Sequence, residues 1–252
     1  MKKTATSILC VVLLLIIVGH TATHSVSAIE ATEAATPSPK QDLKIKMADG
    51  LDIVATFYPT TGTDKAPVVL LLHQFEGDRG QWDPIIPDLT GHNYNVLAID
   101  LRGFGNTGGT ADWKLAVTDG LALMGWLRNQ SSVDPDRVAV IGASIGADLA
   151  LKVCAADTDC HTAIALSPGL SFPDGMTTDT VKNMTNKAIL LIAAQLDRVS
   201  SSAVKLLTDV APVDLTIMSK LYASVRNHGV ELLTHPDVSP LILQWLDTYN
   251  KK

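Results

Sequence analysis

The stretch RVAVIGASIGADLALKVCA, residues 137–155, decides which fold the sequence predicts. It begins as an apolar, β-branched run typical of a buried strand, and from Ile145 onward its apolar spacing is that of a helix. Between the two lies Gly142-Ala143-Ser144-Ile145-Gly146, which fits the pattern G-x-S-x-G. A strand-to-helix turn of this kind requires small residues at Gly142 and Gly146 and projects the Ser144 hydroxyl above the sheet. The alternative interpretation is an ordinary glycine-rich turn of an α/β protein.

The rest of the chain alternates between strand-like and helix-like patterns. We predict strands at 42–47, 51–58, 67–73, 94–100, 137–142, 162–166, 188–194 and 213–218, and helices at 82–89, 113–127, 145–156, 178–184, 200–210 and 238–249. Asp49-Gly50 marks a hairpin turn between the first two strands. The alternation predicts a single α/β domain with an eight-stranded, mostly parallel sheet and helices on both faces. Chemistry in such sheets occurs at the carboxyl ends of the strands.

Two further polar residues follow strands in the order that a catalytic triad requires. Asp197 comes directly after the strand 188–194, and His228 lies in the loop between the last strand and the final helix. A histidine there can take the proton of Ser144 and return it to a leaving group, while a carboxylate fixes the tautomer of the imidazole. We therefore predict that Ser144, Asp197 and His228 are catalytic. His235, closer to the final helix, is the alternative base.

An oxyanion site is expected beside Ser144. The Ile145 N–H lies at a helix N-terminus, where backbone donors suit a developing negative charge. A second donor is expected from the loop that follows the strand 67–73, and we favour the Phe75 N–H, with Gln74 as the alternate. His73 is expected to form hydrogen bonds within this loop rather than to catalyse. No Cys/His cluster has zinc spacing and no glycine loop fits a nucleotide, so the sequence predicts neither a metal nor a cofactor.

Five segments together resemble the α/β-hydrolases, and within them the dienelactone hydrolase-like and esterase branch. They are LLHQFEGDRGQW, AIDLRGFGNTGG, VDPDRVAVIGASIGADLAL, ILLIAAQLD and NHGVELL, and the resemblance extends over residues 43–249. It implies a nucleophile elbow at Ser144 and triad roles for Ser144, Asp197 and His228. The sequence departs from this pattern twice, because dienelactone hydrolases use a cysteine nucleophile and because the usual His-Gly is His73-Gln74 here.

The segment 167–177 is too short for the helical cap that many α/β-hydrolases insert at this place, so we expect no large cap domain and an open site. Leu170, Phe172 and Met176 are its candidate walls. An open site favours a carboxylesterase that acts on small or short-acyl esters through an acyl-enzyme. A peptidase or thioesterase with the same triad, or a non-catalytic relative that only binds, are the alternatives. Asp148, one turn after Ser144, is expected to be a carboxylate favoured by the helix dipole rather than a substrate contact.

The first 28 residues are typical of a secretory signal peptide. Lys2 and Lys3 precede an eleven-residue apolar run, 8–18, and small residues precede a cleavage site after Ala28. A run of eleven residues is too short to span a bilayer as a helix, although an uncleaved anchor is the alternative. Residues 29–40 are expected to be a flexible linker and 41–252 the catalytic domain, which would be secreted or periplasmic.

Composition limits the partners and the redox state of the exported chain. The net charge of −6 and the pI of about 5.6 offer no basic surface for nucleic acid. We therefore expect a small-molecule ester as the partner, with no nucleic acid and no stable membrane insertion of the mature chain. Cys154 and Cys160 remain after signal removal, and an even pair in an exported protein predicts a disulfide. The alternative is two buried free thiols.

Overall fold

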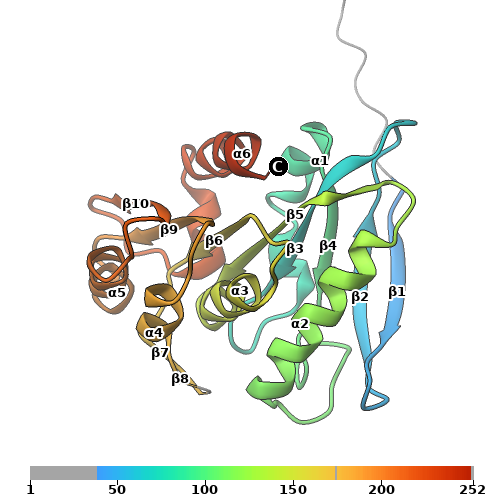
Figure 1. Ribbon diagram of the computed structural model, residues 1–252, viewed down its shortest axis with the longest axis horizontal. Coiled ribbons are helices and arrows are strands. Elements are labelled where there is room, and N and C mark those ends of the chain that lie inside the picture. Colours follow the sequence, from blue (N-terminus) through green and yellow to red (C-terminus); the bar gives the residue numbers. More distant parts are fainter. Residues whose placement is uncertain (1–38, 174, 251–252) are drawn as a thin grey trace, which may run out of the picture. The chain divides into compact units, whose positions relative to one another are not determined.

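The computed structural model describes residues 39–173 and 175–250, so the predicted signal peptide 1–28 and most of the predicted linker 29–40 lie outside the described residues. One eight-stranded sheet has the order β1-β2-β4-β3-β5-β6-β9-β10 (Figure 1). Its strands are β1 Gln41–Lys46, β2 Asp52–Tyr58, β3 Ala66–Leu72, β4 Asn95–Ile99, β5 Val133–Ala143, β6 Thr162–Leu166, β9 Ala188–Ala194 and β10 Thr216–Tyr222. Within this sheet only the pairs β1–β2 and β2–β4 are antiparallel, which confirms the predicted fold class.

Helices cover both faces of the sheet and create two apolar cores (Figure 1). One core contains side chains of α2 Trp113–Arg128, α3 Ile145–Ala156, α4 Thr177–Lys182 and α5 Arg198–Asp209, and the other contains side chains of α1 Ile86–Gly91 and α6 Val238–Tyr249. Two 3₁₀ helices, η1 Arg79–Trp82 and η2 Gly229–Thr234, complete the described helices. In the described part of the chain, no helix has the length and apolar character needed to cross a membrane.

The strand β3 shows why the sequence contains continuous apolar runs. All seven of its residues are buried, with Val68, Leu70 and Leu72 in one core and Val69 and Leu71 in the other. Successive side chains of a strand point to opposite faces. A strand covered by helices on both faces must therefore be apolar at every position.

The last strand is displaced from its prediction. The sequence predicted it at 213–218, whereas β10 runs over Thr216–Tyr222 and pairs with β9 from Thr216 opposite Ala188. Val213 lies outside the strand and is fully exposed. Because β10 is an edge strand with mostly exposed side chains, its apolar residues do not mark its position.

Two smaller differences concern short elements. The helix predicted at 82–89 divides into η1 and α1, and a two-stranded hairpin, β7 Ser171–Phe172 with β8 Gly175–Met176, was not predicted. Between β6 and α4 the described residues carry only this hairpin, so they contain no helical cap.

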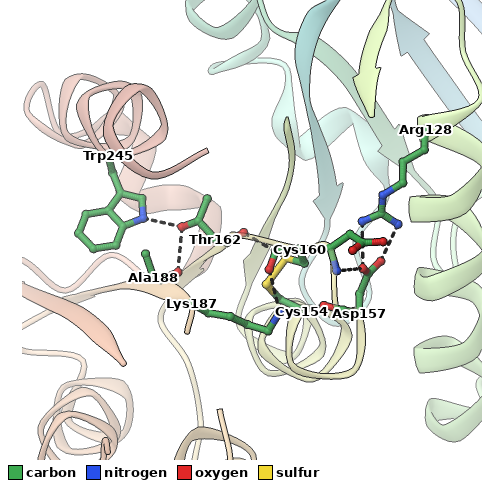
Figure 2. Close-up of a disulfide and its surroundings, with 9 residues drawn as sticks. Arg128, Cys154, Asp157, Cys160, Thr162, Lys187, Ala188 and Trp245 are labelled. Carbon is green, nitrogen blue, oxygen red and sulfur yellow. Dashed lines mark hydrogen bonds and ion pairs between the residues drawn. A yellow bond between two sulfur atoms is a disulfide. The ribbon is translucent and has the colours of Figure 1, made fainter. Parts of the chain in front are cut away.

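A disulfide joins Cys154 near the end of α3 to Cys160 just before β6 (Figure 2). Around it, the Arg128 guanidinium of α2 donates two hydrogen bonds to the Asp157 carboxylate, at 2.8 and 2.9 Å. The Lys187 ammonium donates to the backbone carbonyls of Asp157 and Cys160, each at 2.8 Å. The disulfide and its neighbours thus connect α2, α3 and the start of β9 at the end of the sheet opposite Ser144.

We expect the double variant Cys154→Ala/Cys160→Ala to lose about 2 kcal/mol of unfolding free energy, because a disulfide over so short a loop constrains the unfolded chain only modestly. For a domain of this size that loss corresponds to a fall in Tm of roughly 4–8 °C. Thermal melts followed by circular dichroism measure it, and a reducing agent applied to the wild type should produce the same fall. An unchanged Tm in both experiments would contradict the disulfide's role.

Candidate active site

Ser144 occupies a backbone conformation that the sequence around it makes possible. Its φ is 53° and its ψ −120°, between the end of β5 and the start of α3. A Cβ on Gly142 would collide with the carbonyl of Gly146, and a Cβ on Gly146 would collide with the carbonyl of Leu72 at the end of β3. The Ser144 N–H donates to the Leu166 carbonyl at 2.8 Å. Both glycines are therefore sterically required, and Ser144 is held between the ends of β3 and β6.

The structure brings Asp197 and His228 to Ser144 from two other strand ends. The His228 Nε2 lies 2.8 Å from the Ser144 Oγ, and the His228 Nδ1 lies 2.6 Å from the Asp197 Oδ2. Asp197 follows β9 and also begins α5, where its Oδ1 accepts a hydrogen bond from the Ser200 N–H at 3.3 Å. The three predicted residues thus form one continuous hydrogen-bonded chain.

The Asp197 carboxylate is suited to orient a histidine that becomes charged. Burial by itself would raise its pKa, but hydrogen bonds from His228 and Ser200 outweigh that effect, so that its pKa lies below the ordinary value. Asp197 is therefore ionised at neutral pH and accepts the Nδ1–H of His228. This leaves the His228 Nε2 as the acceptor for the Ser144 hydroxyl.

The alternative base, His235, lies elsewhere. Its ring packs against Tyr222 with the centroids 4.3 Å apart and the planes inclined by 47°, and its Nδ1 accepts from the Asp237 N–H at 3.3 Å. The hydrogen bond to Ser144 comes from His228. Among residues 39–173 and 175–250, no three His, Cys, Asp or Glu side chains are grouped so that they could hold a metal ion.

The predicted oxyanion donors lie at adjacent strand ends. Leu72 of β3 is paired with Gly142 of β5, which places the loop after β3 beside the turn that carries Ser144. Ile145 is the first residue of α3, and the N–H groups of a helix's first turn have no partner within the helix. Within the described residues, the Phe75 N–H donates to no backbone carbonyl. The same holds for the N–H of the alternate donor, Gln74, so the geometry leaves both alternatives open.

His73 has the structural role that the sequence predicted. It is fully buried, its Nδ1 lies 2.7 Å from the Gln74 carbonyl, and its Nε2 accepts from the Leu101 N–H at 2.9 Å. Because Nε2 is an acceptor, the ring is neutral with its proton on Nδ1, and burial lowers its pKa accordingly. His73 therefore joins the loop after β3 to the loop after β4 and is not free to exchange protons with a substrate.

The three residues predicted to line the pocket do not share one wall. Phe172 is buried in the core beside α3, and Leu170 is half-buried against the same core. Met176 is exposed and lines a separate hollow of about 510 Å³ between α2, α3 and α4, and neither Ser144 nor His228 lines that hollow. The hairpin β7–β8 thus places Met176 beside these helices, and its role as a wall of the site stays a prediction.

A row of aromatic rings, which the sequence did not reveal, leads away from the loop after β3. Phe75, Phe104, Trp113 and Phe172 are in successive ring contact, with centroid distances of 5.5, 5.7 and 5.7 Å. Phe75 begins the row and is 55% exposed, whereas Phe172 ends it in the core. No local pattern links these residues, since they come from four separate segments.

Asp148 is more deeply buried than expected for a helix-dipole carboxylate. It is only 3% exposed, and its carboxyl oxygens accept from the Gly169 N–H at 3.1 and 3.2 Å and from the Thr177 hydroxyl at 3.0 Å. Burial raises its pKa to about 7. Asp148 therefore fastens both ends of the segment between β6 and α4 to α3, and it changes charge near neutral pH.

This shift predicts a pH-dependent effect of Asp148→Asn. The pKa of Asp148 is about 7 in the folded chain, whereas the ordinary value is 3.8. The folded chain therefore binds this proton more tightly than the unfolded chain, and the free energy of unfolding of the wild type falls as the pH rises from 3.8 to 7. Above pH 7 this contribution to stability is lost completely. An asparagine keeps a carbonyl acceptor without the charge. We expect the Tm of Asp148→Asn relative to wild type to be higher at pH 8.5 than at pH 4.5. The exposed Asp64→Asn is the control, and equal Tm differences at both pH values would contradict the prediction.

The sheet order, together with a serine on a tight turn between β5 and α3, defines the class of protein: it is an α/β-hydrolase. A family model described as serine aminopeptidase, S33, matches residues 63–241, and the chain belongs to this hydrolase family.

Two solved esterases have a similar fold. The Pyrococcus furiosus esterase Pf2001 has a TM-score of 0.70 at 18% sequence identity, over 84% of this chain and 91% of that one. Acetyl xylan esterase 1 from Thermoanaerobacterium sp. JW/SL YS485 has a TM-score of 0.68 at 17% identity, over 86% of this chain and 85% of that one. At such identities the likeness concerns the fold alone.

Sequence relatives cover a smaller part of the chain. An uncharacterized protein of Mycobacterium tuberculosis is 32% identical over 111 residues, which are 44% of this chain and 40% of that protein. The uncharacterized protein YfhR of Escherichia coli K12 is 28% identical over 114 residues, again 44% of this chain and 40% of that protein. The match thus spans less than half the length of these curated relatives.

Proposed function

We propose that the protein is a serine hydrolase that cleaves carboxylic esters, with Ser144 as nucleophile, His228 as general base and Asp197 as its orienting carboxylate. The observation that carries this proposal is the continuous chain from the Ser144 Oγ through His228 to Asp197, with distances of 2.8 and 2.6 Å. Nucleophile, base and orienting group within hydrogen-bond reach are the geometry that activates a serine hydroxyl.

The reaction follows from these positions in two balanced halves. The Ser144 Oγ attacks the ester carbonyl carbon while its proton passes to the His228 Nε2, and the carbonyl oxygen becomes an oxyanion that the Ile145 and Phe75 N–H groups would stabilise. Collapse breaks the bond to the alcohol, which receives the proton from His228 and leaves an acyl-serine. Water then gives its proton to His228 and attacks the acyl carbon, and the released Ser144 recovers that proton as the acid departs.

Small or short-acyl esters are the proposed substrates. Support comes from the segment between β6 and α4, whose described residues contain only the hairpin β7–β8, and from the exposed Phe75 beside the site. A long acyl chain gains affinity mainly by burying methylene groups, and an uncapped site offers little such burial.

A series of p-nitrophenyl esters from acetate to palmitate tests this proposal. We expect kcat/KM to be highest between acetate and butyrate and to fall steadily beyond them. Parallel assays of Ser144→Ala subtract hydrolysis that does not depend on the site. A maximum at palmitate would contradict the short-acyl preference, and equal rates for wild type and Ser144→Ala would contradict the ester-cleaving function.

A peptidase is the second candidate, because the matching family model is described as a serine aminopeptidase. The same three residues can cleave an amide if His228 protonates the leaving amine. Aminoacyl p-nitroanilides distinguish the two activities. A kcat/KM for the anilides equal to or above that for p-nitrophenyl acetate would assign the peptidase function.

Export of the chain is also proposed, with cleavage after Ala28. The support is the charged and then apolar pattern of the first residues and the Cys154–Cys160 disulfide, a bond that persists in oxidising compartments. An exported esterase of this kind would meet its substrates outside the cytosol.

A further inference from the structure

Two side chains from distant strand ends hold the backbone that follows His228. The Gly229 N–H donates to the Ser167 Oγ at 2.9 Å, and the Val230 N–H donates to the Gln74 Oε1 at 3.2 Å. Ser167 follows β6, and Gln74 belongs to the loop after β3. Successive amides of the histidine loop are thus tied to both sides of the turn that carries Ser144.

Ser167 is itself firmly placed. Its side chain is buried, with 1% of the residue exposed, and its own N–H donates to the Ile192 carbonyl of β9 at 2.7 Å. Its φ of 53° is unusual for a residue other than glycine and asparagine. This conformation is maintained by the surrounding strands, so the hydroxyl that receives the Gly229 N–H is fixed relative to β6 and β9.

Gln74 and Gly229 fit one another sterically. Gly229 has a φ of 56°, and a Cβ at this position would collide with the Gln74 Oε1. The amide of Gln74 therefore occupies the space that the missing side chain leaves open. The glutamine after His73, where the resemblance to related hydrolases would place a glycine, thus contacts the histidine loop directly.

The loop has one more distant hydrogen bond, from the Leu196 N–H after β9 to the carbonyl of Val225, which lies before His228, at 3.0 Å. The contacts of Asn227 and of the His228 N–H are local and more exposed. The His228 N–H donates to the Glu231 Oε2 at 3.3 Å, and Asn227 donates to the Glu231 carbonyl at 3.1 Å. These bonds shape the loop but do not attach it to the sheet. Apart from the ring of His228 itself, the hydrogen bonds to Ser167 and Gln74 connect the start of η2 to the strand ends.

We propose that Gln74 and Ser167 are positioning residues that fix the His228 ring between Ser144 and Asp197; this rests on the proposed function. Displacement of a reacting group by about 1 Å can cost 100-fold in rate. Side chains that orient a metal-bound histidine typically contribute 10- to 100-fold to activity, and we expect a contribution of the same order here. Gln74 and Ser167 act through the backbone amides next to the histidine, not through the substrate.

Three variants test the proposal with p-nitrophenyl acetate. Gln74→Gly and Ser167→Ala each remove one acceptor, so we expect kcat to fall by about 10-fold or more with KM little changed. Gln74→Glu keeps an acceptor for the Val230 N–H, so we expect its plateau kcat to lie clearly above that of Gln74→Gly. Thermal melts of all three variants identify any general loss of folding.

The pH profile separates positioning from a general structural role. Asp197 and Glu231 are the acidic groups in contact with His228, and Gln74→Glu would add a third negative charge near its ring. A nearby negative charge favours the imidazolium form. We therefore expect the acid limb of kcat/KM to move to higher pH in Gln74→Glu and to stay in place in Gln74→Gly.

A measurement without turnover keeps this proposal separate from the esterase proposal. NMR titration of the His228 ring should give a higher pKa in Gln74→Glu than in wild type, even if no ester is cleaved. The positioning role would be overturned if Gln74→Gly and Ser167→Ala both kept the kcat of wild type and the His228 pKa in Gln74→Glu were unchanged. If the wild type cleaved no ester but the His228 pKa rose in Gln74→Glu as expected, only the esterase function would be overturned.

Discussion

Replacing Ser144 with alanine is expected to lower kcat/KM for p-nitrophenyl acetate by on the order of 10⁴-fold or more, as loss of the nucleophile does in serine hydrolases generally. The substitution removes only the Oγ, whose hydrogen-bond partner is the His228 Nε2. Without it, no acyl-enzyme can form. A residual rate above that in water would come from the oxyanion donors and from substrate binding.

Folding should be unaffected by this change. The backbone N–H of residue 144 keeps its bond to Leu166, and the glycines that permit the turn are untouched. We expect the Tm of Ser144→Ala to lie close to that of wild type. Ser202→Ala, which removes the same atom from an exposed position of α5, is the matched control and should retain full activity. Comparable activity of both variants would refute Ser144 as the nucleophile.

Asp197→Asn should have the second largest effect, a fall in kcat of on the order of 10⁴-fold at neutral pH. The Asp197 Oδ2 accepts the proton on His228 Nδ1. An asparagine amide can instead donate to Nδ1, which moves the imidazole proton to Nε2. The ring would then have no lone pair to accept the proton of Ser144.

The stability of Asp197→Asn separates this effect from unfolding. Asp197 also caps α5 through its bond to the Ser200 N–H, and asparagine is an equally good N-cap. The Tm should therefore change little. Asp214→Asn, at an exposed position before β10, is the control. Loss of activity in both variants, or in neither, would contradict the orienting role of Asp197.

Four elements could be predicted from the sequence to the residue. The strands β6 and β9 and the helices α3 and α6 begin and end where the apolar patterns predict. The two strands are buried on both faces and are therefore apolar at almost every position. The helix α6 has a buried apolar face and an exposed polar face, which gives a clear helical period. Ser144 and Asp197 could be predicted for a related reason, because each follows a buried strand whose end is well defined. His228 could be predicted only from its place in the loop before the final helix, since the end of β10 was misplaced.

Features that depend on distant contacts could not be predicted. The position of β10 is set by its pairing with β9, because most of its own side chains face solvent. Burial of Asp148 depends on Gly169 and Thr177, which lie more than twenty residues further along the chain. The aromatic row and the bond from Val230 to Gln74 likewise join residues that no periodicity connects.

The central claim, that Ser144 is an activated nucleophile, is tested most directly by labelling the folded protein with a fluorophosphonate and locating the adduct by mass spectrometry. The account predicts one adduct, on the peptide that contains Ser144, with labelling greatly slowed in His228→Ala. A non-catalytic relative that only binds would not react. Folded wild-type protein that remains unlabelled, or that carries the adduct on another residue, would contradict the account.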